Sequence, residues 1–492
     1  MKKNESLTHS TFKGLFWMFC GTGSQAILQF LVMILLARLL SPSDFGIVNA
    51  AMVVISFTTV FSMIGVGPAL IQRPKLTDSH IRSGFTLTIL LSIFFTTLLY
   101  FSSSSIAVFF RMNDLKIILQ TMSLVFLLKG FSVVAESLIQ RKMKFKLFTS
   151  IEVISYIAYG SIGSLCAMVG LGYWALVYAV LGQNITKTIL LFTFERHNMK
   201  PQIHWDSVKE LLFFGGGFTI ARLSNQFALQ ADNLVVGRWL GSYSLGLYGR
   251  AYQLMIMPAN LFGQVMDKVL FPAMARIQKE QNQLSLAYRI GITAVSFVTI
   301  PVGIFICLLS RDIVIILFGK DWLSLVPALQ VLAVGLVFRT SYKISDSLVR
   351  ATGAVYRRAW RQIIYALAVF SGAWIGQHWG IIGVSYGVLF AIIINYCLMT
   401  HLSMQFINLS VKDILQSHVP GLLLGMLAVI SVWLIDWISI EVSILRIFLS
   451  GILFITIVSI LIRINTGRIL GKEMIWIMDQ VVDMIKSRRL KK

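Results

Sequence analysis

LLARLLSPSDFGIVNA, at residues 35–50, is followed 200 residues later by VVGRWLGSYSLGLYGR, at residues 235–250. The two stretches align without a gap, and an arginine, a leucine and a glycine recur at matching places: Arg38 with Arg238, Leu40 with Leu240, and Gly46 with Gly246. In each copy the arginine stands a few residues before a serine- or glycine-bearing turn. A phrase repeated at a constant offset predicts that the chain contains two copies of one structural unit.

The composition is that of a membrane protein. The chain has 492 residues, of which 57% are hydrophobic and 13% are charged, whereas a soluble domain is about half apolar and about a quarter charged. The apolar residues form long runs, for example 45–71, 85–110 and 381–400. Because about 20 helical residues cross a hydrocarbon core, these runs predict an all-α, polytopic membrane protein with about fourteen transmembrane helices.

The net charge of +22 arises from basic residues that cluster in alternate connections between the apolar runs, such as 73–82, 141–146 and 357–361. The intervening connections, such as GLG at 170–172, nearly lack them. Lys and Arg concentrate on the cytoplasmic side of membrane proteins. We therefore predict a multi-pass protein of the bacterial inner (plasma) membrane, with both termini cytoplasmic and membrane lipids around it, and we predict no binding of nucleic acid.

The repeat also predicts the arrangement of the spans. Six predicted spans separate the two copies, so both copies enter the membrane in the same direction, as parallel repeats about a pseudo-two-fold axis do. A second register, offset by 210 residues, aligns Lys129 with Arg339. The predicted parts are an amino-terminal lobe of spans one to six (1–194), a cytoplasmic linker (195–210), a carboxy-terminal lobe of spans seven to twelve (211–403), two additional spans (417–464) and a basic, amphipathic cytoplasmic tail (465–492).

Several predicted spans carry ionisable residues, which cost a few kcal/mol inside a membrane and normally face a protein interior or water. On the tenth span one helical stripe holds four of them, at i, i+4, i+7 and i+11: Arg339, Lys343, Asp346 and Arg350. The matching stripe of the amino-terminal lobe holds Lys129, Glu136 and Gln140. One hypothesis is that these side chains pair with one another or reach for the membrane interface. The other is a water-filled central cavity with an excess of positive charge.

The second hypothesis names candidate residues. Those predicted to contact an anionic substrate in the cavity are Lys129, Arg339, Lys343, Arg350, Arg222, Asn225, Gln226, Arg250 and Gln25. The recurring pair Arg38 and Arg238 is predicted to belong to a periplasmic gate. The carboxylates predicted as possible sites of proton or Na⁺ coupling are Asp232, Glu136, Asp346 and Asp267.

The sequence lacks the common motifs of catalytic sites. It contains no Gly-rich phosphate loop, no metal-spaced histidine pair and no nucleophile elbow. Its four cysteines fall inside apolar runs without paired spacing. We therefore predict no catalytic residue, no metal and no cofactor.

Four motifs, of which the first belongs to the repeated stretch, carry a family resemblance: LLARLLSPSDFG (35–46), LIQR (70–73), VLFPAMARIQ (269–278) and LFGKDWLSLVPALQVL (317–332). With them the chain resembles the Wzx-type polysaccharide exporters, in particular the colanic acid and teichuronic acid exporters of the MOP superfamily, to which the MATE antiporters and the MurJ lipid II flippase also belong. The resemblance implies a MATE-like fold of two six-helix lobes plus two extra carboxy-terminal helices.

The resemblance also implies a function. Such exporters flip undecaprenyl-diphosphate-linked oligosaccharide, the repeat unit of an exopolysaccharide, O-antigen or capsule, to the periplasmic leaflet by alternating access. Partners would be that lipid-linked oligosaccharide and the polysaccharide polymerase and glycosyltransferases of the same pathway. A lipid II flippase and a cation-coupled multidrug antiporter of the same fold are the alternatives, and a membrane-embedded polysaccharide polymerase is a remote alternative.

Overall fold

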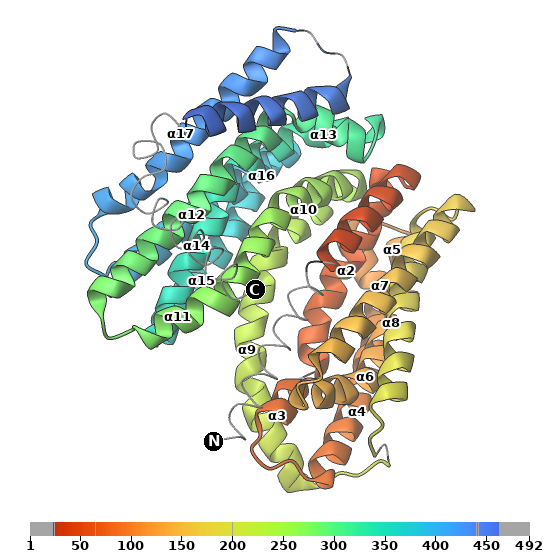
Figure 1. The fold of residues 1–492 in the computed structure, drawn as a ribbon. Coiled ribbons are helices and arrows are strands. Elements are labelled where there is room, and N and C mark those ends of the chain that lie inside the picture. Colours follow the sequence, from red (N-terminus) through yellow and green to blue (C-terminus); the bar gives the residue numbers. More distant parts are fainter. Residues whose placement is uncertain are drawn as a thin grey trace, which may run out of the picture. The chain divides into compact units, whose positions relative to one another are not determined.

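The computed structural model describes residues 23, 25–63, 65–198, 200–438, 440 and 442–461, and for residues 211–212, 214–225, 264–265 and 267–268 it describes the backbone only. Every element in these ranges is a helix or a helical turn (Figure 1), which confirms the all-α class. The predicted tail at 465–492 and the beginning of the first predicted span lie outside the described residues.

Ten helical stretches of the described chain are long and apolar enough to cross a membrane, which confirms a polytopic membrane protein. One of these stretches, Val355–Ser403, contains two helices joined by a short turn. A predicted count of fourteen would also require the shorter apolar helix Gln25–Leu39 and the two more polar helices α9 (Trp205–Val235) and α10 (Gly241–Val265) to span. The count therefore stays a prediction.

The internal contacts of the chain divide it into Met1–Leu247 and Tyr248–Lys492, which are called here the amino-terminal unit and the carboxy-terminal unit. This division places the predicted linker, 195–210, and all of α9 with the amino-terminal unit. The predicted lobes at 1–194 and 211–403 follow from the sequence repeat, and they remain predictions.

The amino-terminal unit is a bundle around two apolar clusters. Its helices after Gln25–Leu39 are α2 (Pro42–Met63), α3 (Val66–Gln72), α4 (Asp78–Phe110), α5 (Leu115–Met122), α6 (Leu124–Arg141), α7 (Phe145–Met168), α8 (Tyr173–Phe194), α9, the π-helical turn Val236–Leu240 and the start of α10. One cluster joins α3, α4 and α6 through the side chains of Leu70, Phe85 and Val134. The other joins α6, α7 and α8 through Ile139, Ile151 and Leu191, so α6 lies at the centre of the bundle.

The second predicted span is a broken helix, because α2 and α3 are separate elements. Gly65 has a φ of 63°, in the left-handed region that glycine adopts without strain, and it precedes α3. At the other end of α3, one guanidinium nitrogen of Arg141 donates to the carbonyl oxygens of Leu70 at 2.9 Å and of Ile71 at 3.0 Å. A cation at the carboxyl end of a helix satisfies its unpaired carbonyls. The short helix is thereby held against α6.

The linker is docked onto the amino-terminal unit by hydrogen bonds. The backbone N–H groups of Gln202 and His204 donate at 3.0 Å to the hydroxyls of Thr86 and Ser83 on α4. At the start of the linker, Glu195 accepts hydrogen bonds from the ammonium groups of Lys142 and Lys144 in the turn between α6 and α7. Burial alone would raise the pKa of the Glu195 carboxyl, but these two hydrogen bonds hold that pKa below its ordinary value.

The carboxy-terminal unit is a second bundle, around a core of α11, α12 and α14. Its elements are the rest of α10, the π-helical turn Met266–Leu270, α11 (Phe271–Arg276), α12 (Gln281–Leu308), α13 (Ser310–Leu317), the 3-10 turn Lys320–Leu325, α14 (Val326–Ala351), α15 (Val355–Gly376), the 3-10 turn Gln377–Trp379, α16 (Gly380–Ser403), α17 (Val411–Asp436) and the helix Ser443–Leu461. Met274, Tyr288 and Ile344 are fully buried in the core.

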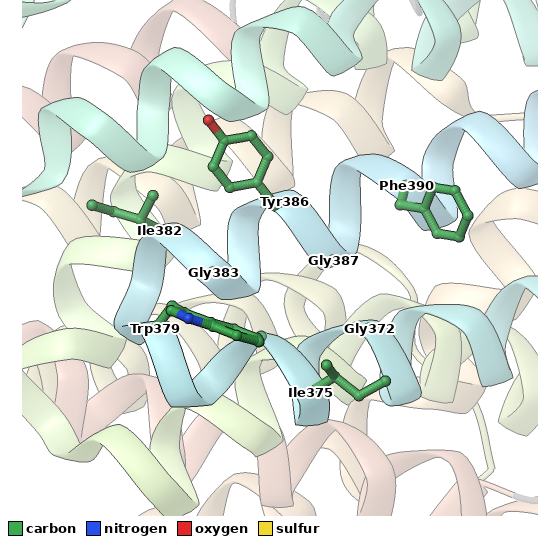
Figure 2. Close-up of a pocket in the computed structure, with 9 residues that line it drawn as sticks. Gly372, Ile375, Trp379, Ile382, Gly383, Tyr386, Gly387 and Phe390 are labelled. Atoms are coloured by element: carbon green, nitrogen blue, oxygen red, sulfur yellow. The ribbon is translucent and has the colours of Figure 1, made fainter.

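Helices α15 and α16 cross at four glycines (Figure 2). A Cβ atom on Gly372 would lie 2.7 Å from the carbonyl oxygen of Gly387, and one on Gly376 would lie 2.3 Å from that of Gly383. Small residues allow such backbone contact between membrane helices, where packing rather than hydrophobicity drives association. The two helices are therefore antiparallel and closely packed.

Candidate functional site

A polar cavity of about 310 Å³ lies inside the amino-terminal unit, between α2, α3, α6 and α8. The helix break at Gly65 forms part of its wall. Its other wall residues with polar side chains are Thr59, Lys129, Ser132, Glu136, Ser137, Gln140, Asn184 and Lys187. Non-helical backbone at membrane depth is stable only where it is buried in protein or lines a polar cavity. The polar lining of the cavity is therefore consistent with a helix break at this position.

The charges at this cavity are paired. The ammonium of Lys187, on α8, lies 3.0 Å from a carboxylate oxygen of Glu136 on α6 and 2.6 Å from one of Glu152 on α7. The same ammonium lies over the ring of Phe148, 5.9 Å from its centroid. Gln140 donates to the other oxygen of Glu136 at 3.4 Å. The charged residues at the cavity are thus two lysines, Lys129 and Lys187, and two glutamates, Glu136 and Glu152.

The sequence analysis predicted only some of the residues at this cavity. The predicted stripe of Lys129, Glu136 and Gln140 does line one cavity. Asn184, Lys187 and Glu152 were missed. The run LGQNITKTILLF at 181–192 places Asn184 and Lys187 three residues apart in an apolar span, and the rule that marks ionisable residues in spans would have found Lys187.

In the carboxy-terminal unit the stripe on α14 begins with a buried arginine. Arg339 is only 6% exposed, and its guanidinium donates a hydrogen bond to the hydroxyl of Tyr365 on α15. It also lies over the rings of Tyr252 and Tyr365, 5.9 and 6.0 Å from their centroids. Aromatic faces stabilise a guanidinium without neutralising it. Arg339 therefore retains its positive charge in an apolar bundle.

At the carboxyl end of α14, the residues of the stripe form a network of ion pairs. The Asp346 carboxylate accepts from Arg350 at 3.1 Å and forms a second, shorter ion pair with Arg358 on α15. The Arg350 guanidinium lies 5.0 Å from the ring centroid of Phe271. Lys343, half-buried, passes close to α10, because a Cβ on Gly263 would lie 2.5 Å from its ammonium nitrogen. The whole stripe is thus used in side-chain packing within this unit.

The remaining predicted residues lie at several places. Asp232 is buried and accepts a hydrogen bond from the backbone N–H of Asn233 at 2.8 Å, while Arg250 donates to Gln253. Gln25 and Gln226 are half-buried. The side chains of Arg222, Asn225 and Asp267 lie outside the described part of the structure.

The two arginines of the repeated phrase differ in their surroundings. Arg38 is exposed, whereas the half-buried Arg238 has its guanidinium 5.2 Å from the ring centroid of Phe109 and 5.7 Å from that of Trp239. The glycines of the phrase instead meet directly. A Cβ on Gly46 would lie 1.7 Å from the carbonyl oxygen of Ser242 and 3.0 Å from the backbone nitrogen of Gly246. The two copies of the phrase thus contact each other within the amino-terminal unit.

A larger groove, of about 710 Å³, follows the crossing of α15 and α16 (Figure 2). Its wall consists of the four crossing glycines together with Ile375, Trp379, Ile382, Tyr386 and Phe390. No ionisable carboxylate, lysine or arginine is among them, so the groove offers nothing that would neutralise a phosphate or balance a cation. The polar cavity of the amino-terminal unit and the α14 stripe of the carboxy-terminal unit are therefore two separate candidate sites. Among the described residues, no group of three or more His, Cys, Asp or Glu side chains converges as a metal site would.

Comparisons with known proteins identify the family of the chain. A model of the polysaccharide biosynthesis protein family matches residues 35–327. The chain is 27% identical to the lipopolysaccharide biosynthesis protein WzxC of Escherichia coli (79% of this chain, 80% of the relative) and 25% identical to the teichuronic acid biosynthesis protein TuaB of Bacillus subtilis (84% and 86%).

Among solved structures, the fold is similar to that of the lipid II flippase MurJ in an inward closed conformation. The TM-score is 0.74 at 17% identity, over 91% of this chain and 98% of that one. The MurJ-like fold agrees with the predicted fold class, and the family match covers more than half of the chain. The chain is therefore a multi-pass membrane protein that belongs to the polysaccharide biosynthesis protein family.

Proposed function

We propose that this protein is a flippase that moves undecaprenyl-diphosphate-linked oligosaccharide from the cytoplasmic to the outer leaflet of the inner membrane, and that it performs no catalysis. The names of the relatives, a lipopolysaccharide and a teichuronic acid biosynthesis protein, support a lipid-linked polysaccharide repeat unit as cargo. The MurJ-like fold supports flipping of a lipid-linked saccharide, since that neighbour is named a lipid II flippase.

The observation that carries the proposal is Arg339, a guanidinium buried in a membrane-spanning helix among tyrosine rings. Placing an arginine at the centre of a membrane costs about 2.5–3.5 kcal/mol, so a role in binding would explain its presence. A diphosphate is a dianion that resists desolvation unless it is paired, and a guanidinium offers two parallel donors to phosphate oxygens. In the amino-terminal unit, the amides of Gln140 and Asn184 and the hydroxyl of Ser132 line the polar cavity, and such groups form hydrogen bonds with sugar hydroxyls.

The gate belongs to the same proposal. We place both termini in the cytoplasm, which puts the Arg38 and Arg238 phrases at the periplasmic side. There the contact between Gly46 and Gly246 would close the outer exit while the cargo is loaded from the cytoplasm. Opening would require the two phrases to separate, as alternating access demands.

The energy source follows from the charge of the cargo. About two negative charges would move from a negative interior to a positive exterior, and each charge releases about 2.3 kcal/mol per 100 mV. The membrane potential could therefore drive export without ATP. The carboxylates Asp232, Glu136, Asp346 and Asp267 remain the candidates for proton or Na⁺ coupling.

The experiment is reconstitution of the purified protein into vesicles that contain fluorescent undecaprenyl-diphosphate-linked oligosaccharide, lipid II or an amphipathic cationic drug. Accessibility of each compound to an impermeant quencher or hydrolase reports its movement. We expect flipping of the oligosaccharide that depends on Arg339. Faster movement of lipid II would assign the protein to cell-wall synthesis, and movement of the drug alone would assign it to multidrug export.

A further inference from the structure

Lys187 lies between two carboxylates at the polar cavity, and this arrangement supports an inference that does not concern the cargo. Its ammonium lies between Glu136 and Glu152, at 3.0 and 2.6 Å from their carboxylate oxygens. The three side chains come from three helices, α6, α7 and α8, and all three are about one fifth to one quarter exposed. One ammonium thus fills the place between two carboxylates at the wall of a membrane-embedded cavity.

The surrounding groups are those of a monovalent-cation site. Glu136 and Glu152 supply carboxylate oxygens, and the amides of Gln140 and Asn184 line the same cavity. A Na⁺ ion takes oxygen ligands of this kind, and a proton on either carboxylate would have the same effect on the charge. Two carboxylates that lie this close together repel each other, and a cation between them offsets this repulsion.

Among the described residues, few of those that line the cavity are charged. Helices α2 and α3 and the break between them contribute Thr59, Met63, Gly65, Gly67, Pro68 and Ile71 to the lining, and none of these ionises. Helix α6 contributes Lys129 and Glu136, α7 contributes Glu152, and α8 contributes Lys187. The charge balance of the cavity therefore changes by a full unit when Lys187 loses its ammonium.

We propose that Lys187 is a tethered counter-cation that occupies a latent monovalent-cation site formed by Glu136 and Glu152. While the ammonium is in place, the cavity takes up neither Na⁺ nor a proton. This inference removes Glu136 from the four carboxylates proposed above for ion coupling and leaves Asp232, Asp346 and Asp267. When the ammonium is removed, the cavity takes a free monovalent cation in its place. This inference concerns the cavity alone and does not depend on which lipid-linked saccharide the protein carries.

The test is binding of ²²Na⁺ to the purified full-length protein in detergent, with choline as the replacement cation, together with thermal unfolding in Na⁺ or choline from pH 5 to pH 8. The variants are Lys187→Met, which removes the charge, and Lys187→Arg, which keeps it. Lys116→Met makes the same change at an exposed lysine on α5 and is the matched control. None of these readouts uses the cargo, so a failed flipping assay leaves the result intact.

We expect no saturable Na⁺ binding in the native protein, in Lys187→Arg or in Lys116→Met. Lys187→Met is expected to gain either saturable Na⁺ binding or, in the proton arm, an unfolding temperature that rises as the pH falls. The added substitutions Glu136→Gln and Glu152→Gln should abolish the gain. Na⁺ binding by the native protein that Glu136→Gln removes would overturn the proposal, as would a Lys187→Met protein that gains neither response.

A variant that keeps a polar side chain covers the case in which Lys187→Met does not fold. Lys187→Gln removes the same positive charge and leaves an amide in place of the ammonium. It is expected to gain the same response to Na⁺ or to low pH as Lys187→Met, and an unfolding temperature indifferent to both cations would contradict the proposal.

Discussion

Gly46 and Gly246 are reciprocal neighbours in the amino-terminal unit. A Cβ on Gly46 would lie 1.7 Å from the carbonyl oxygen of Ser242, and a Cβ on Gly246 would lie 1.8 Å from that of Pro42. Pro42 and Ser242 are separated by the same 200 residues as the two glycines. A contact in which i meets j and the equivalent of j meets the equivalent of i is the mark of a local two-fold relationship. The repeated phrase of the sequence therefore contacts its own copy.

The first prediction concerns this contact. Gly46→Ala and Gly246→Ala each place a methyl group against backbone that cannot move aside as a flexible side chain could, so we expect the two phrases to separate. Leu245, which is fully buried, would become accessible. A Leu245→Cys variant, with the four native cysteines replaced, should react faster with an impermeant maleimide when either alanine is present.

Gly451→Ala is the matched control, because nothing lies within 4 Å of a Cβ at that position. It should leave both the labelling of Leu245→Cys and the flipping rate unchanged. Equal labelling in all variants would mean that the contact does not act as a gate.

The second prediction concerns Arg339 and Lys343. Each alanine variant should lose flipping activity by about 10–100-fold, because a charge-assisted hydrogen bond to a phosphate contributes about 1.5–3 kcal/mol. Insertion should remain normal, since transfer of a cation into the membrane is unfavourable. Arg311→Ala, at an exposed position on α13, should flip normally. Normal flipping by the double variant would exclude the cationic binding site.

The third prediction concerns a polar network at the start of the last described helix, Ser443–Leu461. Asp312 accepts at 2.6 Å from both the Ser443 hydroxyl and the Arg446 guanidinium, and Arg446 also donates to Asp436 at 2.7 Å. Arg446→Met leaves the 6%-exposed Asp312 without this partner, so we expect a loss of about 1–3 kcal/mol in the free energy of unfolding. Thermal unfolding in detergent measures it. Adding Asp312→Asn should restore part of the loss, and an additive double variant would show that the two residues do not interact.

The fourth prediction concerns pH and the docking of the linker. The folded state lowers the pKa of Glu195 below its ordinary value of 4.5, through its hydrogen bonds to Lys142 and Lys144. A lowered carboxyl pKa contributes stability above pH 4.5, and this contribution is lost as the pH falls through the lower, folded-state value. The unfolding temperature of the native protein should therefore drop more steeply below pH 4.5 than that of Glu195→Gln. Parallel curves would show that the linker contact adds no stability.

The fifth prediction concerns the driving force. A bare dianion that crosses a potential of 100 mV gains about 4–5 kcal/mol, so an inside-negative potential should accelerate export in vesicles without any ion gradient. The potential and the gradients of H⁺ and Na⁺ are imposed separately. Flipping that ignores the potential but follows a proton or Na⁺ gradient at zero potential would establish antiport instead.

The sequence by itself determined the class of this protein. The long apolar runs, the ionisable residues within them and the 200-residue repeat are each local or periodic patterns, and such patterns predict membrane helices and their polar faces. Those features were sufficient for the all-α membrane class, for the stripe of Lys129, Glu136 and Gln140, and for the repeated phrase. The family resemblance then followed from four short motifs.

Only the tertiary structure decided which of these residues meet. Lys187 pairs with Glu136 and Glu152, which are 51 and 35 residues earlier in the chain, and the pairing depends on how α6, α7 and α8 are rotated and packed. Hydropathy indicates which segments cross a membrane, but it does not indicate which neighbour a side chain contacts. For the same reason the meeting of Gly46 with Gly246, the break at Gly65 and the tyrosines around Arg339 became visible only in the fold. Charges in spans can be predicted one helix at a time, whereas their neutralisation is a property of the packed bundle.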